Sequence, residues 1–569
     1  MFDWIDGLAQ TIAQFTNGTF GPAADFMEHY VWLWPKQAPL LAVILVGTGL
    51  FVTLRLGFVQ VRGFKHAVAI TMGKYDNPED EGDLKHYQAL TTALSATVGI
   101  GNIAGVALAI RLGGPGALFW MWLTAFFGMA LKYVECSLAL MYRKVHRDGS
   151  VSGGPMYYIE MGLGRRWKWM AILFAAFAAI ASFGGGCMNQ SNSLADQVHS
   201  QLGIPTVITG LVFSALVAMV IIGGIKRIGR VTAILAPGMA LLYVTGALII
   251  LILNFSEIPG GLALIVTQAF APEPLIGGGV GSIMLTVMWG IRRGLFSNEA
   301  GQGSAPIAHA TAKTTEPIRE GLVASLGPFI DTLVICTLTG LVIIMTGAYK
   351  DKVPQDLSLA DLEVVMAPAA TDGSLMDLRA AREALDEATL SVVNGRPVNG
   401  TLFLNESVVG EISIHVADGA AWTGELPVDP ENGELMLSDD VTLKANGTAL
   451  LNGAPLTAQA FRNGLGEIGG MLVTLAVVLF AVSTGISWSY YGDRSVEYLF
   501  GSSAIGIYRW VFIGFFFLGS ILPLKAVWTY GDVALGLMTL PNLIAVFLLA
   551  GGVARATKEY FSREHVPYK

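Results

Sequence analysis

Two short glycine-rich stretches interrupt long apolar segments of this sequence. Gly99 to Gly105 reads GIGNIAG, and Gly290 to Gly303 reads GIRRGLFSNEAGQG. Each lies where a membrane-spanning helix is expected to run without interruption. A break at membrane depth exposes backbone N–H and C=O groups, which is tolerated only where they line a cavity or hold a ligand. The two stretches therefore predict where this chain binds a ligand.

Composition places most of the chain in a lipid bilayer. The 569 residues are 53% apolar and only 14% charged, whereas soluble globular proteins carry about 25% charged residues. Apolar segments long enough to span a membrane predict eleven helices. These segments are 38–56, 89–110, 116–141, 168–195, 204–223, 231–254, 280–308, 321–347, 465–490, 507–525 and 531–554. Prolines and glycines break up 257–279, which is expected to be a loop or a short surface helix.

Lys and Arg predict the orientation of these helices. One set of loops, together with the C-terminal tail, carries 22 basic residues, whereas the opposite short loops hold only Lys36, Arg111 and Lys525. By the positive-inside rule, the N-terminus lies outside and the C-terminus lies in the cytoplasm. We therefore expect a multi-pass protein of a bacterial cytoplasmic (inner) membrane, in contact with lipid and without a nucleic-acid partner.

Residues 349–463 do not fit a bilayer. They contain 7 Lys and Arg against 18 Asp and Glu, and Asn-Gly and Asp-Gly turns separate alternating segments such as 401–404 and 411–416. The sequence predicts a small, acidic, mostly β insertion on the outer face. It could act as a lid, dock an extracytoplasmic partner or concentrate a ligand, or it could be an insertion that an exposed loop tolerates.

The order of the spans predicts an internal symmetry. If the first span is accessory, five spans over 89–254 and five over 280–554 remain, and each set begins with a glycine-broken helix. An odd number of spans per set forces the two sets into opposite orientations. In such inverted repeats the substrate and the coupling ion bind near the midplane, between repeats that rock around them.

The fold class is accordingly an all-α polytopic membrane protein with an inverted five-plus-five repeat, one accessory N-terminal helix and a small β insertion. The expected segments are 1–88 (interfacial segment, accessory helix and linker), 89–254 (first repeat), 255–348 (outer loop and start of the second repeat), 349–463 (insertion) and 464–569 (end of the second repeat and tail).

The first break offers opposite charges to a ligand. The last carbonyls of the helix that contains Ser95, Thr97 and Val98 suit a cation, and the free N–H groups expected where the helix resumes at Asn102 suit a carboxylate. Gly99 and Gly101 let a ligand approach the backbone. Small-residue helix packing is the alternative for Gly101 and Gly105, which are spaced as in GxxxG.

Polar residues elsewhere in the spans add candidates. Arg292 and Arg293, expected to be partly neutralised by Glu299, would each cost about 2.5–3.5 kcal/mol in an apolar span, so they indicate a polar cavity. Ser297 and Gln302 supply further hydrogen-bonding groups. Three residues in other spans are less specific: Asp331 could lie near the ion path or make a structural hydrogen bond, Thr484 could complete a cation site, and Trp488 could line a cavity.

These motifs resemble the alanine or glycine:cation symporter family. The resemblance rests on VGIGNIAG, GGPGALFWMW (113–122), GGPMYYIEMGLG (153–164), GIRRGLFSNEAGQGSAP and STGISWSYYGDR (483–494). It covers about 89–347 and 465–554 and implies Na⁺-coupled or H⁺-coupled uptake of alanine or glycine, through the inverted fold shared with neurotransmitter:sodium symporters. Typical members of the family lack the outer insertion.

The resemblance also implies roles for particular residues. Amino-acid binding falls to Gly99, Gly101, Asn102, Ser297, Gln302 and Thr484. Cation binding falls to Ser95, Thr97, Val98, Asn102, Ser483 and Thr484. Independently of the resemblance, the polar and aromatic residues in the spans suggest gating or cavity electrostatics for Arg292, Arg293, Glu299, Asp331 and Trp488.

Other functional classes fit the sequence less well. A channel needs a continuous polar pore, a sensor needs an output module beyond the short tail, and an enzyme needs catalytic groups at the right spacing. No cofactor is expected, and Na⁺ is expected as the coupling ion. The choice between alanine and glycine, and between Na⁺ and H⁺, stays open.

Overall fold

The structure is a computed structural model. It describes residues 27, 29–34, 40–146, 151–272, 280–357, 359, 362–365, 388–404, 407–416, 419–429, 433, 435–436 and 443–567. The predicted interfacial segment at the N-terminus lies largely outside the described residues.

The first half of the chain is helical. Its elements are η1 (His29–Leu33), α2 (Leu40–Arg55), α3 (Val59–Arg62), α4 (Phe64–Thr71), α5 (His86–Thr97), η2 (Gly101–Gly105), α6 (Val106–Gly113), α7 (Ala117–Met141), α8 (Pro155–Gly162), η3 (Arg165–Trp167), α9 (Lys168–Phe183), η4 (Gly184–Met188), α10 (Asn189–Leu202), α11 (Thr206–Ile221), α12 (Gly224–Leu253), η5 (Phe255–Glu257) and α13 (Ile258–Gln268). A two-residue hairpin pairing, β1 (Lys144–Val145) with β2 (Val151–Ser152), joins α7 to α8.

The second half repeats this helical character around the insertion. Its helices are α14 (Val280–Asn298), α15 (Ala305–His309), α16 (Pro317–Pro328), η6 (Phe329–Cys336), α17 (Thr337–Met345), η7 (Ala348–Lys350), α19 (Gly453–Leu465), α20 (Glu467–Phe500), η9 (Ser502–Ala504), α21 (Ile505–Gly519) and α22 (Leu524–Phe561). Helix ends follow ordinary local chemistry: α10 stops at Gly203, whose φ of 67° suits glycine, and Pro205 precedes α11.

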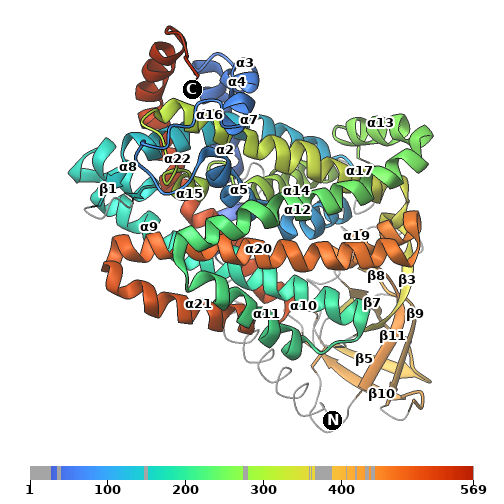
Figure 1. Ribbon diagram of the computed structural model, residues 1–569. Helices are drawn as coiled ribbons and strands as arrows, with labels where there is room; N and C mark the ends of the chain where they lie inside the picture. Colours follow the sequence, from blue (N-terminus) through green and yellow to red (C-terminus); the bar gives the residue numbers. More distant parts are fainter. Residues whose placement is uncertain are drawn as a thin grey trace.

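Helices from the first half of the chain pack against helices from the second half. Helix α7 contacts α16, α10 contacts α20, and α11 contacts α21, while α22 crosses to α9 (Figure 1). One continuous apolar core joins these helices. Helix α2 lies at the edge of the bundle, where it contacts α7 and α22.

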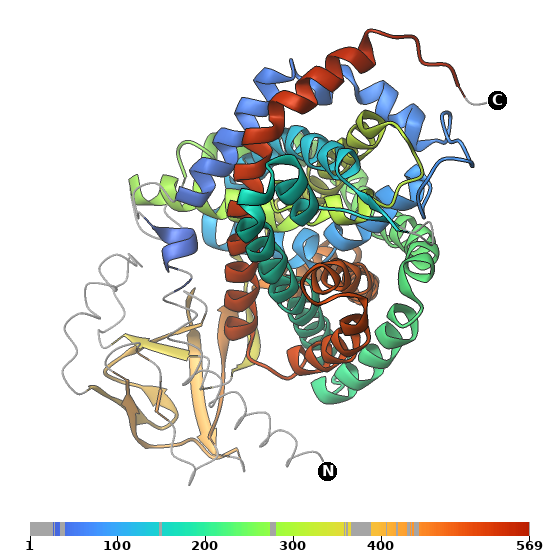
Figure 2. The same cartoon turned by 90° about the vertical axis from the view of Figure 1, so that its left-hand side faces the viewer.

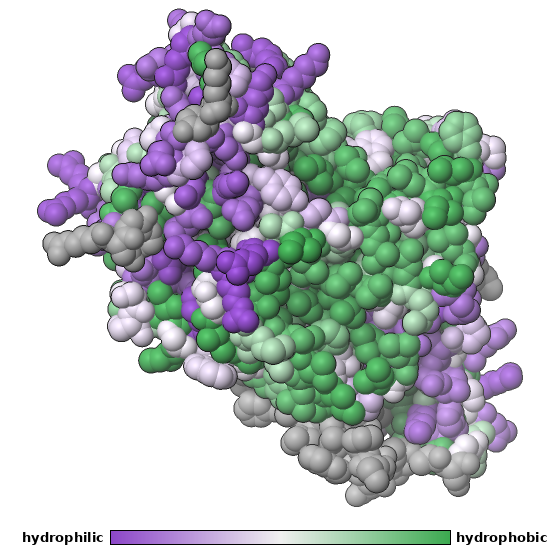
Figure 3. Space-filling view, in the orientation of Figure 1, coloured by the Kyte–Doolittle hydropathy of each residue, from purple (hydrophilic) through white to green (hydrophobic). Residues whose placement is uncertain are grey.

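The surface of the bundle has the distribution expected of a membrane protein. Figure 3 shows an apolar surface between two hydrophilic regions, one over α3, α4 and α8 and the other over the β strands. The C-terminus lies near the first region and far from the strands in both ribbon views (Figures 1 and 2). The strands and the C-terminal tail are therefore on opposite sides of the apolar surface.

The strands of the insertion form three small antiparallel sheets. Their bounds are β3 (Lys352–Leu357), β4 (Leu362–Val365), β5 (Ala388–Val393), β6 (Arg396–Pro397), β7 (Thr401–Leu404), β8 (Ser407–Val408), β9 (Gly410–Val416), β10 (Gly424–Val428) and β11 (Leu443–Leu450). The strand orders are β10-β5-β6, β3-β11-β9 and β4-β7-β8. They share an apolar core separate from that of the helices. The first and last strands, β3 and β11, pair so that Lys352 lies opposite Leu450.

The structure confirms the main features predicted for the fold. The chain is a mostly helical polytopic membrane protein with a small β-rich region at 352–450, and the strands predicted at 401–404 and 411–416 are β7 and β9. Within 349–463, the last residues form α19, which packs on the helical bundle. Every predicted span contains a helix.

The number of spans stays a prediction. Among the described residues, seven helices are long and apolar enough to cross a membrane, and a bent pair, α5 with η2 and α6, makes eight. Helices α2 and α11 are apolar but have 16 residues each.

The separate core of the strands predicts that the helical bundle folds without them. We expect a variant in which an Asn-Gly turn replaces 353–449, joining Lys352 to its cross-strand neighbour Leu450, to elute as one species and to melt within a few degrees of the full chain. Size-exclusion chromatography and thermal unfolding in detergent would measure this. An aggregated variant would show that the strands are needed for the fold of the bundle.

Candidate functional site

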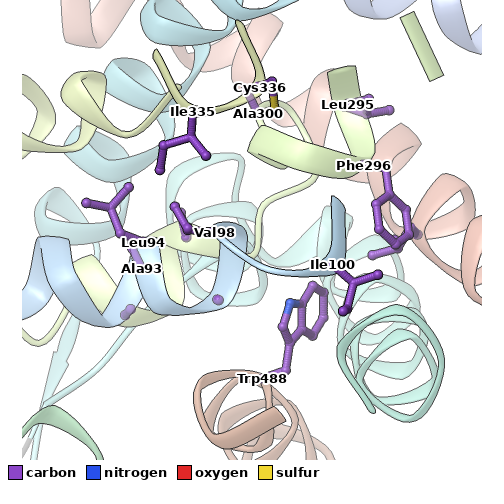
Figure 4. Packing of buried hydrophobic residues seen from close by; sticks show 14 of the residues in the cluster. Ala93, Leu94, Val98, Ile100, Leu295, Phe296, Ala300, Ile335, Cys336 and Trp488 are labelled. Carbon is purple, nitrogen blue, oxygen red and sulfur yellow. The ribbon is translucent and has the colours of Figure 1, made fainter. Parts of the chain in front are cut away.

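The first predicted break is present between α5 and α6. Helix α5 ends at Thr97, Val98 leaves the helical conformation with ψ 87°, and a π-helical turn resumes at Gly101. The two helical parts are bent by 53°. Figure 4 shows Val98 and Ile100 on the connection between them, with the indole of Trp488 facing that connection from α20.

Side chains of the protein itself bind the backbone of this break. The Gly99 N–H donates to Oδ1 of Asn102 at 2.9 Å, and the Ile100 N–H donates to Oε1 of Gln190 at 3.3 Å. The N–H of Asn102, which we expected to be free, donates to the Gly99 carbonyl at 3.1 Å. Two side-chain amide oxygens thus accept hydrogen bonds from N–H groups of the break. A buried N–H without an acceptor would cost folding free energy, and these hydrogen bonds avoid that cost.

The second break is shorter than the sequence predicted. Helix α14 continues through Arg292 and Arg293 to Asn298, and only 299–304 leave the helical path before α15. Gly301 and Gly303 have φ of 86° and 84°, the conformation that favours glycine. The prediction that the break starts at Gly290 is wrong, because Gly290 serves packing: a Cβ there would lie 2.5 Å from the Ala117 carbonyl oxygen of α7.

Glu299 opens this second break. Its φ of 54° is rare for a residue with a side chain and costs about 1–3 kcal/mol. Its carboxylate accepts hydrogen bonds from Ser304 and, at 2.9 Å, from Nε1 of Trp488. A strained carboxylate held by two donors beside a helix break is typical of a functional site.

The sequence suggested that Arg292 and Arg293 pair with Glu299, but in the structure they do not. Both bind Asp532 of α22: Nε and Nη2 of Arg292 donate to Oδ2 at 3.0 and 2.6 Å, and Nη2 of Arg293 donates to the same atom. The prediction failed because α14 is helical here, so both arginines precede the break by more than a turn, whereas Asp532 is more than 200 residues away in the chain.

Aromatic rings surround these two arginines. Arg292 lies over Trp32 and Trp289, and Arg293 lies over Trp289, Phe296 and Trp528, all at 5.2 to 5.6 Å from the ring centroids. Nε1 of Trp32 donates to the Asp532 carbonyl at 2.8 Å. The cluster is buried and joins α14 to α22, and removing one partner of such a buried pair costs about 3–5 kcal/mol.

A small cavity lies between the two breaks. Its lining residues are Ala96, Thr97, Gly99, Gly101, Gly185, Gln190, Phe296, Glu299, Trp488 and Leu535. Five of them, Thr97, Gly99, Gly101, Glu299 and Trp488, were singled out from the sequence. The lining combines backbone near Gly99, one amide from Gln190 and one carboxylate from Glu299 with apolar walls. The cavity of about 10 Å³ has room for about one water molecule, so the structure shows a closed conformation of this region.

Sequence reasoning missed Gln190. It lies in α10, directly after the π-helical turn η4, and its Nε2 donates to the Gly185 carbonyl at 2.8 Å. The stretch GGGCMNQSNS at 184–193 puts three glycines and a run of polar residues inside a predicted span. That pattern was the available signal, and it is the same kind of signal that identified the two breaks.

Asn102 faces a polar cluster next to the cavity. Its Nδ2 donates to Oδ1 of Asp331 at 2.7 Å, to the Asp331 carbonyl at 3.1 Å and to Oγ of Ser297 at 3.2 Å. Ser297 and Thr332 each donate to Oδ2 of Asp331 at 2.7 Å. This cluster, which we call the Asp331 cluster, brings together η2, α14 and η6. The sequence had proposed Asn102 and Ser297 for the substrate and Asp331 separately.

The predicted cation residues of α5 and α20 also meet. The Ser95 hydroxyl donates to the Ser483 carbonyl at 3.1 Å and contacts the Ser483 hydroxyl, and the Thr484 hydroxyl donates to the Ser95 carbonyl at 3.1 Å. We call this group the Ser483 cluster. Gly99 lies against it, since a Cβ at Gly99 would be 2.4 Å from Oγ1 of Thr484.

Gln302 is held within the second break, where its Nε2 donates to the Leu295 carbonyl at 3.2 Å. A buried network fixes the same segment from outside. Nδ2 of Asn542 on α22 donates to the Gly301 carbonyl at 2.8 Å and to Glu135 of α7, and Tyr158 donates to Oδ1 of Asn542. Sequence reasoning missed Asn542, because a single polar residue in a separate helix gives no spacing signal, and it expected Glu135 to pair with Lys132 rather than with Asn542.

Known proteins match the chain over nearly its full length. The family model described as the sodium:alanine symporter family matches 23–371 and 435–567, and its gap falls within the β-rich region. A sodium/alanine symporter of Methanococcus maripaludis is 39% identical over 95% of this chain and 97% of its own length. A putative sodium/proton-dependent alanine carrier protein and a probable sodium/glutamine symporter, both of Bacillus subtilis, are 32% and 31% identical, each over 94% of this chain and 92% or 91% of their own lengths.

The close approach at Gly99 gives a direct test of the cavity. We expect Gly99→Ala to abolish binding of alanine or glycine, because the added methyl would meet Thr484 and Gln190. Gly105→Ala is the matched control, since a Cβ there has no atom within 4 Å, and it should bind as the unmodified chain does. Isothermal titration calorimetry on both purified variants would measure this; equal binding by the two would exclude Gly99 from the site.

Proposed function

The chain belongs to the sodium:alanine symporter family, and from this membership and the geometry of the site we infer that it imports alanine or glycine with Na⁺ by alternating access. The family is one of membrane transporters, not of enzymes. One observation carries the proposal: both helix breaks line the same buried cavity, one with the glycines Gly99 and Gly101 and the other with the carboxylate of Glu299.

The lining suggests how a zwitterion would be held. A substrate ammonium would be attracted to Glu299, which accepts from Ser304 and Trp488 and keeps oxygen lone pairs for further donors. A substrate carboxylate would be placed toward the N–H groups at Gly99 and Ile100, which Asn102 and Gln190 now bind. Leu535 and Phe296 close the cavity on the apolar side and favour a short side chain.

Two oxygen-rich clusters beside the cavity would receive cations. The Ser483 cluster offers neutral hydroxyl and carbonyl oxygens, and the carbonyl of Val98 at the end of α5 is expected to contribute, since helix C-termini favour cations. The Asp331 cluster offers the carboxylate and carbonyl of Asp331 with the hydroxyl oxygens of Ser297 and Thr332. Hard cations such as Na⁺ prefer such oxygen ligands.

The inverted repeat supplies the movement in this proposal. The five helical units from α5 to α12 and the five from α14 to α22 each start with a broken helix, and corresponding helices pack pairwise. Rocking of one set against the other would open the cavity to either side in turn. By the positive-inside rule, the strands would lie outside and the C-terminal tail inside.

Asp532, Arg292 and Arg293 form a group that we call the Asp532 cluster. It would close the cavity on the outer side. Phe296 contacts Arg293 and stacks on Trp528 with ring centroids 5.2 Å apart, so the cluster lies directly next to a cavity wall. Opening that side requires α14 and α22 to separate, and the ion pairs between them would then be solvated. In this proposal Arg292 and Arg293 have the gating role expected of them.

Uptake into proteoliposomes tests the proposed function. We expect labelled alanine or glycine to accumulate when Na⁺ is higher outside, and to equilibrate without accumulation when K⁺ replaces Na⁺. A separately imposed proton gradient would reveal coupling to H⁺. Accumulation that is indifferent to every cation gradient would contradict the proposal.

The Ser483 cluster predicts a change in sodium affinity. We expect Ser483→Ala and Thr484→Ala each to raise the Na⁺ concentration for half-maximal uptake about tenfold or more, because each loses an oxygen ligand worth about 1–2 kcal/mol. Ser489→Ala is the matched control on the same helix, since its hydroxyl donates to the Ile486 carbonyl of its own helix at 2.7 Å. A sodium dependence that the first two variants leave unchanged would place the cation elsewhere.

A further inference from the structure

A buried cluster of three titratable side chains lies away from the cavity. Nδ1 of His86 contacts Oε2 of Glu320, and Nδ1 of His309 contacts Oε1 of the same carboxylate at 2.5 Å. His86 and His309 are each 1% exposed and Glu320 is fully buried. We call this the Glu320 cluster.

The Glu320 cluster joins three separate elements of the bundle. His86 is the first residue of α5, His309 is the last residue of α15, and Glu320 lies in the first turn of α16. Helix α5 precedes the first break, and α15 follows the second. One carboxylate therefore connects the ends of both broken helices that point away from the strands.

Backbone hydrogen bonds also join the segment before α5 to the segment after α15. The N–H groups of Asp83 and Leu84 donate to the Thr311 carbonyl at 2.8 and 3.0 Å, and the N–H of Lys313 donates to the Leu84 carbonyl at 2.7 Å. Arg143, after α7, donates to the carbonyls of Ala310, Ala312 and Thr314 and to that of Glu81. Backbone and side-chain hydrogen bonds, together with the Glu320 cluster, thus hold the two segments together at this end of the molecule.

The geometry fixes where the protons lie. An ionised carboxylate only accepts hydrogen bonds, so each Nδ1 carries a hydrogen and donates it. Nε2 of His86 is then the free position for a further proton, and it is buried with no hydrogen-bond partner among the described residues. With both rings neutral, the cluster buries one net negative charge. In the described part of the chain, the two imidazoles are the basic side chains within 4.0 Å of the carboxylate, and each becomes cationic only on taking up a proton.

Other charged groups around the cluster lie farther away or have partners of their own. The negative charge of Asp76 favours a proton on His86, and the positive charge of Arg319 opposes it. Arg143 lies near Glu320 on the side of α7, where Cys136 is a buried neutral thiol. On α20, Arg494 pairs with Glu497 and Asp493 pairs with Arg509, while Arg227 and Arg230 of α12 are exposed. On α22, Tyr560 contacts His66. The carboxylate of Asp83 accepts a hydrogen bond from the Val151 N–H at 3.3 Å.

We propose that the Glu320 cluster is a proton-binding latch, which holds the two broken helices together at the end of the bundle that carries the C-terminus. One proton would turn an imidazole into an imidazolium beside the carboxylate and cancel the buried charge, so the closed end binds a proton more tightly than the open end. By linkage, the latch is strongest at low pH and weakens as the pH on that side rises. Under the predicted orientation, that side is the cytoplasm.

This inference rests on the proposed function in one respect, that the end closed by the latch must open for release of the substrate. Because the proton exchanges with the cytoplasmic side alone, it would regulate release and would not be carried with the substrate. A fall in cytoplasmic pH would slow the cycle by stabilising the closed end. For a single proton the ratio of closed to open forms changes by up to about tenfold per pH unit.

Hydrogen exchange on the full chain in lipid nanodiscs tests the latch without any substrate. We expect the protection factors of amides in 84–90 and 309–316, corrected for intrinsic exchange, to fall between pH 6 and pH 8.5, by up to about tenfold per pH unit. Glu320→Gln keeps the shape and should remove this pH dependence. If that variant does not fold, His86→Gln makes the same test, because it removes the position that takes the proton.

His66→Phe is the matched control for a histidine at the same end of the bundle. Burial, with His565, Arg319 and Lys74 nearby, lowers the pKa of His66 to about 4, so this ring stays neutral over the range tested, and the variant should keep the pH dependence of the unmodified chain. Protection that does not depend on pH, or that keeps its pH dependence in Glu320→Gln, would overturn the latch. Failure of uptake alone, with the exchange result intact, would instead contradict the proposed function.

The same variants can be compared in proteoliposomes at fixed outer pH and fixed Na⁺ gradient. Uptake by the unmodified chain and by His66→Phe should rise several-fold as internal pH increases from 6 to 8.5, and Glu320→Gln should give a flat profile. A flat profile for the unmodified chain would also overturn the proposal.

Discussion

The hydrogen-bonding demand of the backbone in a bilayer governs the rest of this structure. Interrupting a helix in lipid leaves N–H and C=O groups without partners, and each costs several kcal/mol unless something else binds it. This chain interrupts two helices and brings the interruptions together around one cavity. Its own side chains, Asn102 and Gln190 at the first break and Asn542 at the second, bind part of the freed backbone.

The same constraint explains why polar side chains concentrate around the breaks. Asp331, Ser297 and Asn102 bind one another on one side of the cavity, and Ser95, Ser483 and Thr484 meet on the other. Charged groups farther along the same helices have partners at opposite ends: Arg292 and Arg293 bind Asp532 at one end, and Glu320 binds His86 and His309 at the other. In our proposal the two end clusters stabilise closure of opposite sides of one central site.

Local patterns predicted much of this from the sequence. Apolar segments located the helices, turn dipeptides located the β-rich region, and the glycines at 99 and 101 located the first break, since each is a signal carried by neighbouring residues. The glycines at 290 and 294 were misread, because helix packing and helix breaking both select glycine and only φ distinguishes them. The pairing of Arg292 and Arg293 with Asp532 and of Glu320 with two histidines joins distant segments, so no spacing in the sequence indicates it.

The most direct measurement of the central claim is a cryo-EM map of the protein in nanodiscs with Na⁺ and alanine. The account predicts density for one amino acid between the two breaks, against Gly99 and Gly101 on one side and Glu299 on the other. It also predicts an ion at the Ser483 cluster or at the Asp331 cluster. A map that places the amino acid outside the cavity between the breaks, with both breaks in contact only with protein, would contradict the account.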